Sequence, residues 1–312
     1  MKVVTQPNNN SSLETPILVI AFNRPDLTYQ LFEALRQIKP KRLYVAIDGA
    51  RNEEEKERVE KVKDVFRSVD WECEVKQLYR KENLGCKRGV KSAIDWLFEN
   101  EEQGIILEDD CIPDPSFCSY AESALNHYKD EEKVFMIAGS NFHADENSKN
   151  ITAYFSKIAE IWGWATWRRA WAHYIEQSDF KEEDILPTIE DALTDKGYAA
   201  ILANGMVSAY NGQIDTWDYQ WWYTILVKKA FVLKPPVNLI CNIGYGEFST
   251  HIKEKTSFNE MPLSSLRKNV KFPGVIRQNR YADFVDVKIF RQNRLLKKSI
   301  FLYLKFLYSR MR

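Results

Sequence analysis

The chain has 312 residues and a mass of 36.6 kDa; 45% of its residues are hydrophobic and 28% are charged. This composition excludes a disordered or fibrous protein, and the length suffices for one large core or two small ones. The 44 basic and 44 acidic residues balance, so no overall field attracts the chain to nucleic acid. Five widely spaced cysteines in so large a chain favour a reducing cytosol over a disulfide framework.

Residues 1–14 are polar, and we expect them to form a disordered segment rather than a signal peptide. No stretch of about 18 apolar residues occurs, so the sequence predicts no membrane-spanning helix. The expected location is the cytoplasm.

Strands and helices are predicted to alternate over the first third of the chain. The apolar or alternating patterns typical of strands occur at residues 15–22, 43–47, 71–79 and 104–107. The apolar spacing of amphipathic helices occurs between them, at residues 25–38, 52–69 and 83–99. This order predicts an α/β protein with a Rossmann-like, mostly parallel sheet flanked by helices.

Beyond about residue 140 the periodicity weakens and aromatic residues become frequent. No repeat or linker divides the chain, so we interpret residues 15–286 as one domain with two halves, 15–140 and 141–286. Residues 287–312 are interpreted as an amphipathic helical tail, because the last 22 residues hold seven basic and no acidic side chains. Such a tail either lies on an anionic membrane surface or docks on its own domain.

Polar residues follow three of the predicted strands, at Arg24, at Asp48 and at Glu108-Asp109-Asp110. Ligands of open α/β sheets bind at the carboxyl ends of the strands, so these residues predict a nucleotide site. Arg24 can stack on or bind a base, and Asp48 can accept hydrogen bonds from uracil or ribose. Either residue alone is also compatible with ordinary turn chemistry.

The three consecutive acids repel one another, which favours a compensating cation. Mn²⁺ or Mg²⁺ takes oxygen ligands and bridges to substrate phosphates, so the motif is a candidate diphosphate–metal site. A solvated acidic loop is the alternative. The sequence contains neither the glycine-rich dinucleotide fingerprint nor the P-loop motif, so a metal rather than a glycine cradle is expected to neutralise phosphate.

Two aromatic-rich segments follow in the second half. Residues 161–171 contain four tryptophans, and tryptophan faces bind sugar rings when they are not packed in a core. The candidates for a sugar pocket are Trp162, Gly163, Trp164 and Trp217. Asp218 lies among aromatics that can raise the pKa of a carboxylate, which suits a general base. The alternatives are that Asp218 caps a helix and that Asp215 is the base.

Five motifs, in their order and separation, resemble the N-acetylglucosaminyltransferase I family of inverting nucleotide-sugar glycosyltransferases, over roughly residues 15–252. They are PILVIAFNRP, VAIDG, ILEDD, WGW and TWDYQW. The resemblance implies a glycosyltransferase A (GT-A) fold, a UDP-sugar donor and Mn²⁺. It also implies that Arg24 contacts the uracil, that Asp48 binds the nucleoside and that Lys87 or Arg88 reaches the donor phosphates.

The same resemblance assigns the metal to Asp110, places Glu108 and Asp109 at the sugar and ribose, and makes Asp218 the catalytic base. The segment 244–251, which contains Ser249, is similar to the family's glycine-bearing segment that closes over the donor. His251 is a second candidate metal ligand, because a late histidine ligates the metal in other transferases of this fold.

The sequence thus predicts an inverting, metal-dependent glycosyltransferase of the hexosyl- or N-acetylhexosaminyltransferase type. It would move GlcNAc or a related hexose from a UDP-sugar to a glycan or lipid-linked glycan in bacterial surface polysaccharide synthesis. Residues 15–140 would bind the nucleotide and residues 141–286 the acceptor, with the tail in peripheral contact with the inner face of the membrane. A sugar-1-phosphate nucleotidyltransferase and an inactive glycan-binding protein of the same fold are the alternatives.

Overall fold

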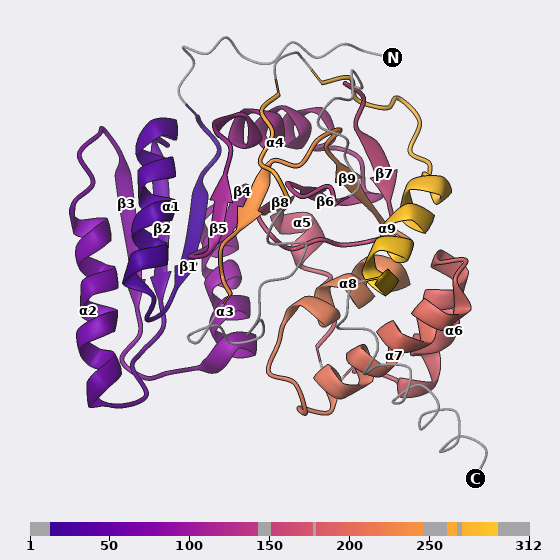
Figure 1. Ribbon diagram of the computed structural model, residues 1–312, viewed down its shortest axis with the longest axis horizontal. Helices are drawn as coiled ribbons and strands as arrows, with labels where there is room; N and C mark the ends of the chain where they lie inside the picture. The colour runs from indigo at the N-terminus through magenta and orange to yellow at the C-terminus, as the bar shows by residue number, and fades with distance from the viewer. Residues whose placement is uncertain (1–12, 143–150, 177–178, 246–260, 267–269, 293–312) are drawn as a thin grey trace.

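The largest feature of the protein is an eight-stranded sheet flanked by helices (Figure 1). The computed structural model describes residues 13–142, 151–176, 179–245, 261–266 and 270–292. The strands follow the order β3-β2-β1-β4-β8-β6-β9-β7. Their bounds are β1 Ile17–Ala21, β2 Arg42–Ile47, β3 Glu74–Tyr79, β4 Gln103–Glu108, β6 Val134–Ala138, β7 Tyr154–Ser156, β8 Trp164–Trp167 and β9 Phe231–Lys234.

The sheet is mostly parallel. Strands β1 to β4 are mutually parallel, β8 is antiparallel to both β4 and β6, β9 is parallel to β6, and β7 is antiparallel to β9. A separate antiparallel pair joins β5, Cys111–Pro113, to β10, Ile240–Asn242. This pair brings the chain around residue 242 beside the acidic end of β4.

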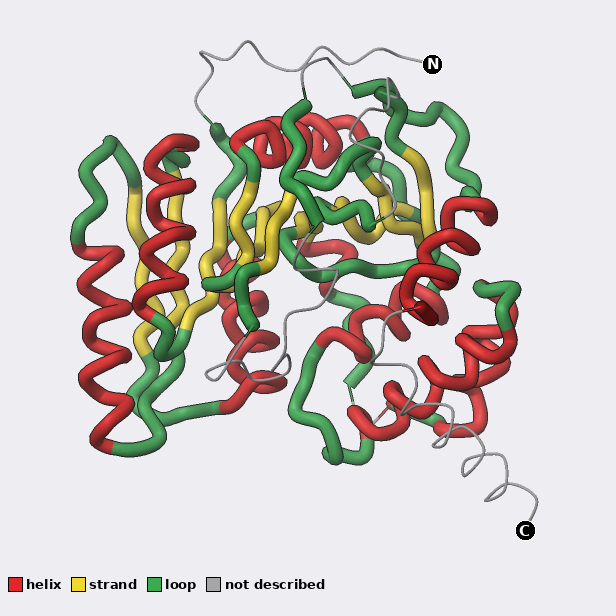
Figure 2. The backbone as a smooth tube through the Cα atoms, viewed as in Figure 1, coloured by secondary structure: helices red, strands yellow, loops and turns green. Residues whose placement is uncertain are grey.

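The helices that flank the sheet are shown in Figure 2. Helix α1 packs against α2 and α4, α3 packs against β1 and β4, and α6, α7 and α8 pack against one another. Their bounds are α1 Pro25–Ile38, α2 Glu53–Arg67, α3 Gly85–Asn100, α4 Pro115–His127, α5 Arg168–Trp171, α6 Glu182–Ala192, α7 Lys196–Tyr210, α8 Asp218–Val227 and α9 Arg280–Gln292. The protein therefore has the mixed α/β, Rossmann-like fold that the alternating pattern predicts.

The seven elements predicted over the first third of the chain are confirmed. Local signals fix several of their ends. Pro25 occupies the first turn of α1, where its missing N–H costs nothing. The side chain of Asn52 accepts a hydrogen bond from the backbone N–H of Glu55 at 2.9 Å and so begins α2.

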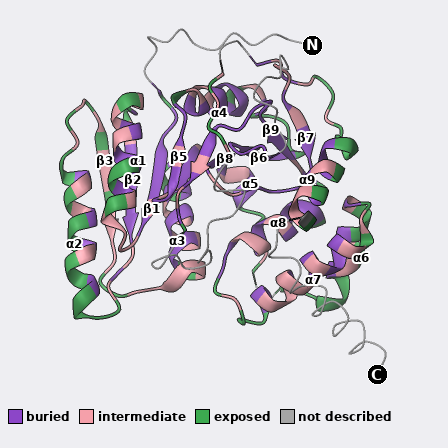
Figure 3. Ribbon diagram, in the orientation of Figure 1, coloured by how far each residue is buried: buried purple, intermediate pink, exposed green. Residues whose placement is uncertain are grey.

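Two hydrophobic clusters stabilise the fold. The main one includes Leu18, Ile105, Ile137 and Leu233, so it runs across the sheet through both expected halves of the chain. The second lies among α6, α7 and α8 and includes Met206. Figure 3 shows the central strands buried and the outer side of α2 exposed.

The expected boundaries at the ends of the chain need correction. Leu13 is already buried, and the backbone N–H of Glu14 donates to Glu122 Oε1 at 2.9 Å, so the ordered fold begins before residue 15. The boundary at residue 286 falls inside α9, where Asp286 and Val287 are both buried. Residues 1–12 and the tail from residue 293 lie outside the described residues. None of the described helices is long and apolar enough to cross a membrane.

Candidate functional site

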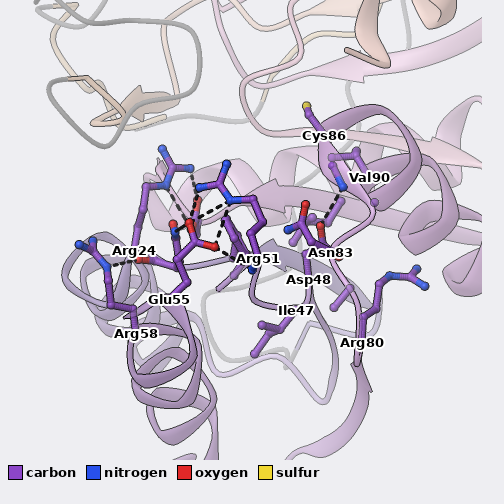
Figure 4. A pocket seen from close by; sticks show the side chains of 18 of the residues that line it. Arg24, Ile47, Asp48, Arg51, Glu55, Arg58, Arg80, Asn83, Cys86 and Val90 are labelled. Atoms are coloured by element: carbon purple, nitrogen blue, oxygen red, sulfur yellow. Dashed lines mark hydrogen bonds and ion pairs between the residues drawn. The ribbon is translucent and has the colours of Figure 1, made fainter. Parts of the chain in front are cut away.

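A pocket of about 580 Å³ lies at the carboxyl ends of β1, β2 and β4. This is the edge of the sheet where the sequence predicts ligand binding, and the volume is typical of small-molecule sites. Figure 4 shows the pocket with several of the side chains that line it. The lining includes Arg24, Asp48, Arg51, Asn52, Glu55, Arg58, Arg80, Asn83, Glu108, Asp109 and Asp215.

Arg24 lies between two acids at the end of β4. Its guanidinium forms an ion pair and hydrogen bonds with Asp109, and its Nη1 is 2.9 Å from Asp110 Oδ2. Burial opposes the charge, yet Asp109 and Asp110 hold the pKa of Arg24 above its ordinary value. Arg24 therefore faces these acids, whereas the resemblance implies a contact with the base; the attraction of the adjacent carboxylates explains the difference.

Glu108 has a pKa far above that of an ordinary carboxyl group, because burial and the neighbouring Asp110 raise the pKa to about 8. Burial also raises the pKa of Asp109, against the effect of Arg24. Three carboxyl groups thus share one arginine at this strand end, and the site has an excess of acidic groups over cations.

Asp110 is held by the last residue of β10 and by the chain just after this strand. Its Oδ1 accepts a hydrogen bond from Asn242 Nδ2 at 3.3 Å, and a Cβ on Gly244 would lie only 1.9 Å from its Oδ2. Only glycine permits this approach, which explains why a glycine opens the segment 244–251. Ser249 and His251 lie outside the described residues, so their predicted roles stay predictions.

The acidic strand end fits a divalent cation in the chemistry of its donors, because carboxylate oxygens are the ligands that Mn²⁺ and Mg²⁺ prefer. In the described part of the chain, no three acidic, histidine or cysteine side chains converge as a metal site. Arg24 is the cation that lies between Asp109 and Asp110 instead. A metal at Asp110 would require Arg24 to move.

Asp48 contacts the start of α3. Its carboxylate accepts hydrogen bonds from the backbone N–H groups of Leu84 at 3.0 Å and Gly85 at 3.1 Å. It also lines the pocket, beside Asn83 in Figure 4. The predicted nucleoside contact of Asp48 is thus compatible with its position, and the capping of α3 is an additional role that the sequence did not reveal.

The carboxylate of Asp215 accepts hydrogen bonds from two further backbone N–H groups at the start of α3. Its Oδ2 accepts from Cys86 N at 2.8 Å and its Oδ1 from Lys87 N at 3.0 Å. Lys87 and Arg88 are not among the described residues that line the pocket. Because carboxylates of the chain already occupy these N–H groups, the start of α3 differs from the phosphate site expected around Lys87 and Arg88.

Asp218 is the first residue of α8 and is half-buried. Its Oδ1 accepts hydrogen bonds from the Thr216 hydroxyl and from Tyr219 N, the latter at 2.8 Å. The charge of Asp218 also raises the pKa of Glu108, although burial and the other neighbouring charges have larger effects. The fold therefore brings Asp218 close to the acidic end of β4, although a part of its carboxylate serves the helix start.

Three of the four residues expected in a sugar pocket belong to the core, which corrects that prediction. Trp164 and Trp217 are each 1% exposed and stack on each other, with ring centroids 5.6 Å apart. A Cβ on Gly163 would lie 2.4 Å from Ile240 Cδ1, so packing against β10 requires this glycine. Trp162 is half-buried and stays a proposed sugar contact. Indole faces covered by protein cannot bind a sugar, so core packing explains Trp164 and Trp217.

The charged start of α2 contributes pocket residues that the sequence analysis missed. Glu55 accepts hydrogen bonds from Asn23 Nδ2 at 3.0 Å and from Arg51, and the bond from Arg51 lowers the pKa of Glu55. Arg58 donates to the backbone oxygen of Asn23 at 2.8 Å. In the sequence these charges have the pattern of a solvated helix face. Their position directly after the second predicted strand is the signal that would have indicated the edge of the sheet where the pocket lies.

No family model matches this chain, and no curated protein matches it. Among solved structures, HddC from Yersinia pseudotuberculosis is similar over 50% of this chain and 77% of its own, with 9% identity and a TM-score of 0.30. UDP-glucose pyrophosphorylase in complex with UDP-glucose is similar over 46% of this chain and 62% of its own, with 8% identity and a TM-score of 0.27. At these values neither likeness bears on function.

Proposed function

We propose that this chain is an inverting glycosyltransferase of the GT-A type, which transfers a sugar from a UDP-sugar to a hydroxyl group. The observation that carries the proposal is the convergence of two distant acidic segments at one pocket. Glu108 and Asp109 at the end of β4 line it, and so does Asp215 from the second half of the chain, three residues before Asp218. The ordered motifs that resemble the N-acetylglucosaminyltransferase I family support the same function.

The nucleoside would occupy the pocket between β1, β2 and α3, where Asp48 and the arginines Arg51, Arg58 and Arg80 offer hydrogen bonds and charge. Asp110 would hold Mn²⁺ or Mg²⁺, with Glu108 and Asp109 beside it. When bound, the cation supplies positive charge to the departing diphosphate.

Asp218 is the proposed general base. It accepts the proton of the acceptor hydroxyl while the acceptor oxygen bonds to the anomeric carbon, and the bond from that carbon to the phosphate oxygen breaks with its electron pair on UDP. We propose a glycan or lipid-linked glycan of a bacterial surface polysaccharide as acceptor, and action in the cytoplasm at the membrane surface. The basic sequence of residues 291–312 supports the membrane contact.

Incubation of the full chain with UDP-sugars and Mn²⁺ tests the proposal. We expect UDP release, and we expect Asp218→Asn to lower turnover at least 100-fold, roughly the contribution of a general base, while UDP binding survives. Asp191→Asn, which removes an exposed carboxylate on α6, is the matched control.

Other outcomes distinguish the alternatives. Pyrophosphate-dependent formation of UTP from a UDP-sugar would identify a nucleotidyltransferase. Binding of UDP-sugars without turnover, with or without Mn²⁺, would identify a non-catalytic binding protein. Unchanged turnover in Asp218→Asn would contradict the assignment of the base.

A further inference from the structure

We propose that Asp215 is a positioning residue that fastens the Asp218 segment to the start of α3. This inference rests on the proposed function, because it concerns the placement of the proposed base. The sequence offers Asp215 only as a rival base. Its contacts in the structure indicate a different role.

Both carboxylate oxygens of Asp215 are engaged by α3. Oδ2 accepts from Cys86 N at 2.8 Å and Oδ1 from Lys87 N at 3.0 Å. Two N–H groups of the first helical turn thus bind a carboxylate that comes from 129 and 128 residues further along the chain, respectively. A helix start leaves such N–H groups without intrahelical partners, and its dipole favours a negative charge there. A base needs an oxygen directed at the acceptor hydroxyl, whereas this carboxylate is directed at the backbone.

Gly85 makes room for the contact. Its φ is +77°, and a Cβ at this position would lie 2.7 Å from Asp215 Oδ2. A side chain at residue 85 would therefore both strain the backbone and push Asp215 away from α3. The helix start is shaped to receive this carboxylate.

The three residues after Asp215 are also fixed. Trp217 is buried in the core, and its backbone oxygen accepts a hydrogen bond from the Tyr174 hydroxyl at 3.0 Å. Thr216 is buried, and its hydroxyl donates to Asp218. The core thus holds Thr216 and Trp217, which lie between Asp215 and Asp218. On the side that faces the pocket, the contact of Asp215 joins this segment to α3.

The substitutions Asp215→Asn and Asp215→Ala test this role. We expect kcat to fall roughly 10- to 100-fold, the cost of a misplaced catalytic group, while the affinity for UDP and the melting temperature stay near those of the wild type. The acidic limb of the kcat–pH profile should persist in both variants, because Asp218 is still present. In Asp215→Ala, hydrogen exchange at the amides of Cys86 and Lys87 should become faster, since each N–H loses its acceptor.

Gly85→Ala provides a second, independent test, with Gly212→Ala as its matched control. Gly212 has a φ of +73°, but a Cβ there would meet no atom of the described residues within 4 Å, so its replacement strains the backbone without displacing a neighbour. We expect both variants to lose stability to a similar degree. Only Gly85→Ala should reproduce the loss of kcat and the faster exchange at Cys86 and Lys87.

The outcomes separate this inference from the proposed function. Unchanged exchange at Cys86 and Lys87 in Asp215→Ala, or unchanged kcat, would overturn the positioning role and leave the transferase intact. Loss of the acidic limb in Asp215→Asn, together with an active Asp218→Asn, would make Asp215 the base. A wild-type chain that transfers no sugar from any donor would overturn the proposed function, and the positioning role with it.

Discussion

Arg24 shows how one residue changes the expected chemistry of the site. Its guanidinium lies 2.9 Å from Asp110 Oδ2 and is also paired with Asp109, and the three side chains are only 16%, 13% and 3% exposed, respectively. The proposed divalent cation and Arg24 would therefore occupy the same space beside Asp110. The divalent cation and the Arg24 guanidinium would therefore exclude each other, because each needs the same carboxylate oxygen of Asp110.

Arg24→Gln is expected to bind Mn²⁺ more tightly than the wild type when no nucleotide is present. Removing a competing ion pair worth about 1.5 kcal/mol corresponds to roughly a tenfold lower Kd. Isothermal titration of the purified chain with Mn²⁺ alone measures the effect directly. Arg36→Gln, which removes a partly exposed arginine from α1, should leave the Kd unchanged. Equal or weaker Mn²⁺ binding by Arg24→Gln would contradict the competition.

Among the elements, a buried lysine joins β9 to α9 and to the loop before β8. Lys234 Nζ is 2.6 Å from Glu160 Oε1 and 2.7 Å from Asp286 Oδ2, and all three side chains are almost fully buried. Two carboxyl groups share one ammonium, and Glu160 Oε2 has no hydrogen-bond partner among the described residues. Burial raises the pKa of Glu160 to about 8, although Lys234 opposes the shift.

This raised pKa predicts a pH-dependent contribution to stability. The folded chain keeps the Glu160 proton up to about pH 8, whereas the unfolded chain loses it near its ordinary value of 4.5. The contribution is therefore complete below about pH 4.5 and declines as the pH rises towards 8. In urea unfolding, the stability of the wild type relative to Glu160→Gln should fall by about 1–3 kcal/mol between about pH 5 and pH 8. A difference that is constant over this range would contradict the assignment.

Across the whole molecule, a tryptophan cluster connects the sheet to the helical part that carries Asp218. Trp164 of β8 stacks on Trp217, and Trp171 and Trp221 pack beside them. Strand β8 is itself inserted antiparallel between β4 and β6. The same residues that fill the core therefore place the start of α8 beside the end of β4.

Trp217→Ala is expected to lower the free energy of unfolding by about 3–5 kcal/mol, the usual cost of removing a large buried aromatic side chain. Chemical denaturation followed by circular dichroism measures this cost. Trp162→Ala serves as the comparison and should cost less, because Trp162 is only half-buried. A loss below about 1 kcal/mol in Trp217→Ala would contradict the core role of this residue.

Local patterns in the sequence are enough to predict the fold class and the edge of the sheet at which the pocket lies. Short apolar runs, helical spacing, Pro25 and Asn52 each act over a few residues, and parallel strands bring their polar ends together wherever the crossovers are regular. The positions of Asp48 and of the three acids at the end of β4 follow from that order alone.

What those side chains face depends on the folded chain. The pairing of Arg24 with Asp109 and Asp110, the contact of Asp215 with α3, and the burial of Trp164 and Trp217 all join residues far apart in the chain. No local pattern distinguishes a tryptophan that stacks on another tryptophan from one that stacks on a sugar, or an acid that binds a metal from one that binds an arginine. These choices depend on which neighbour the fold brings within a few ångströms, because ion pairs and packing contacts act only over that distance.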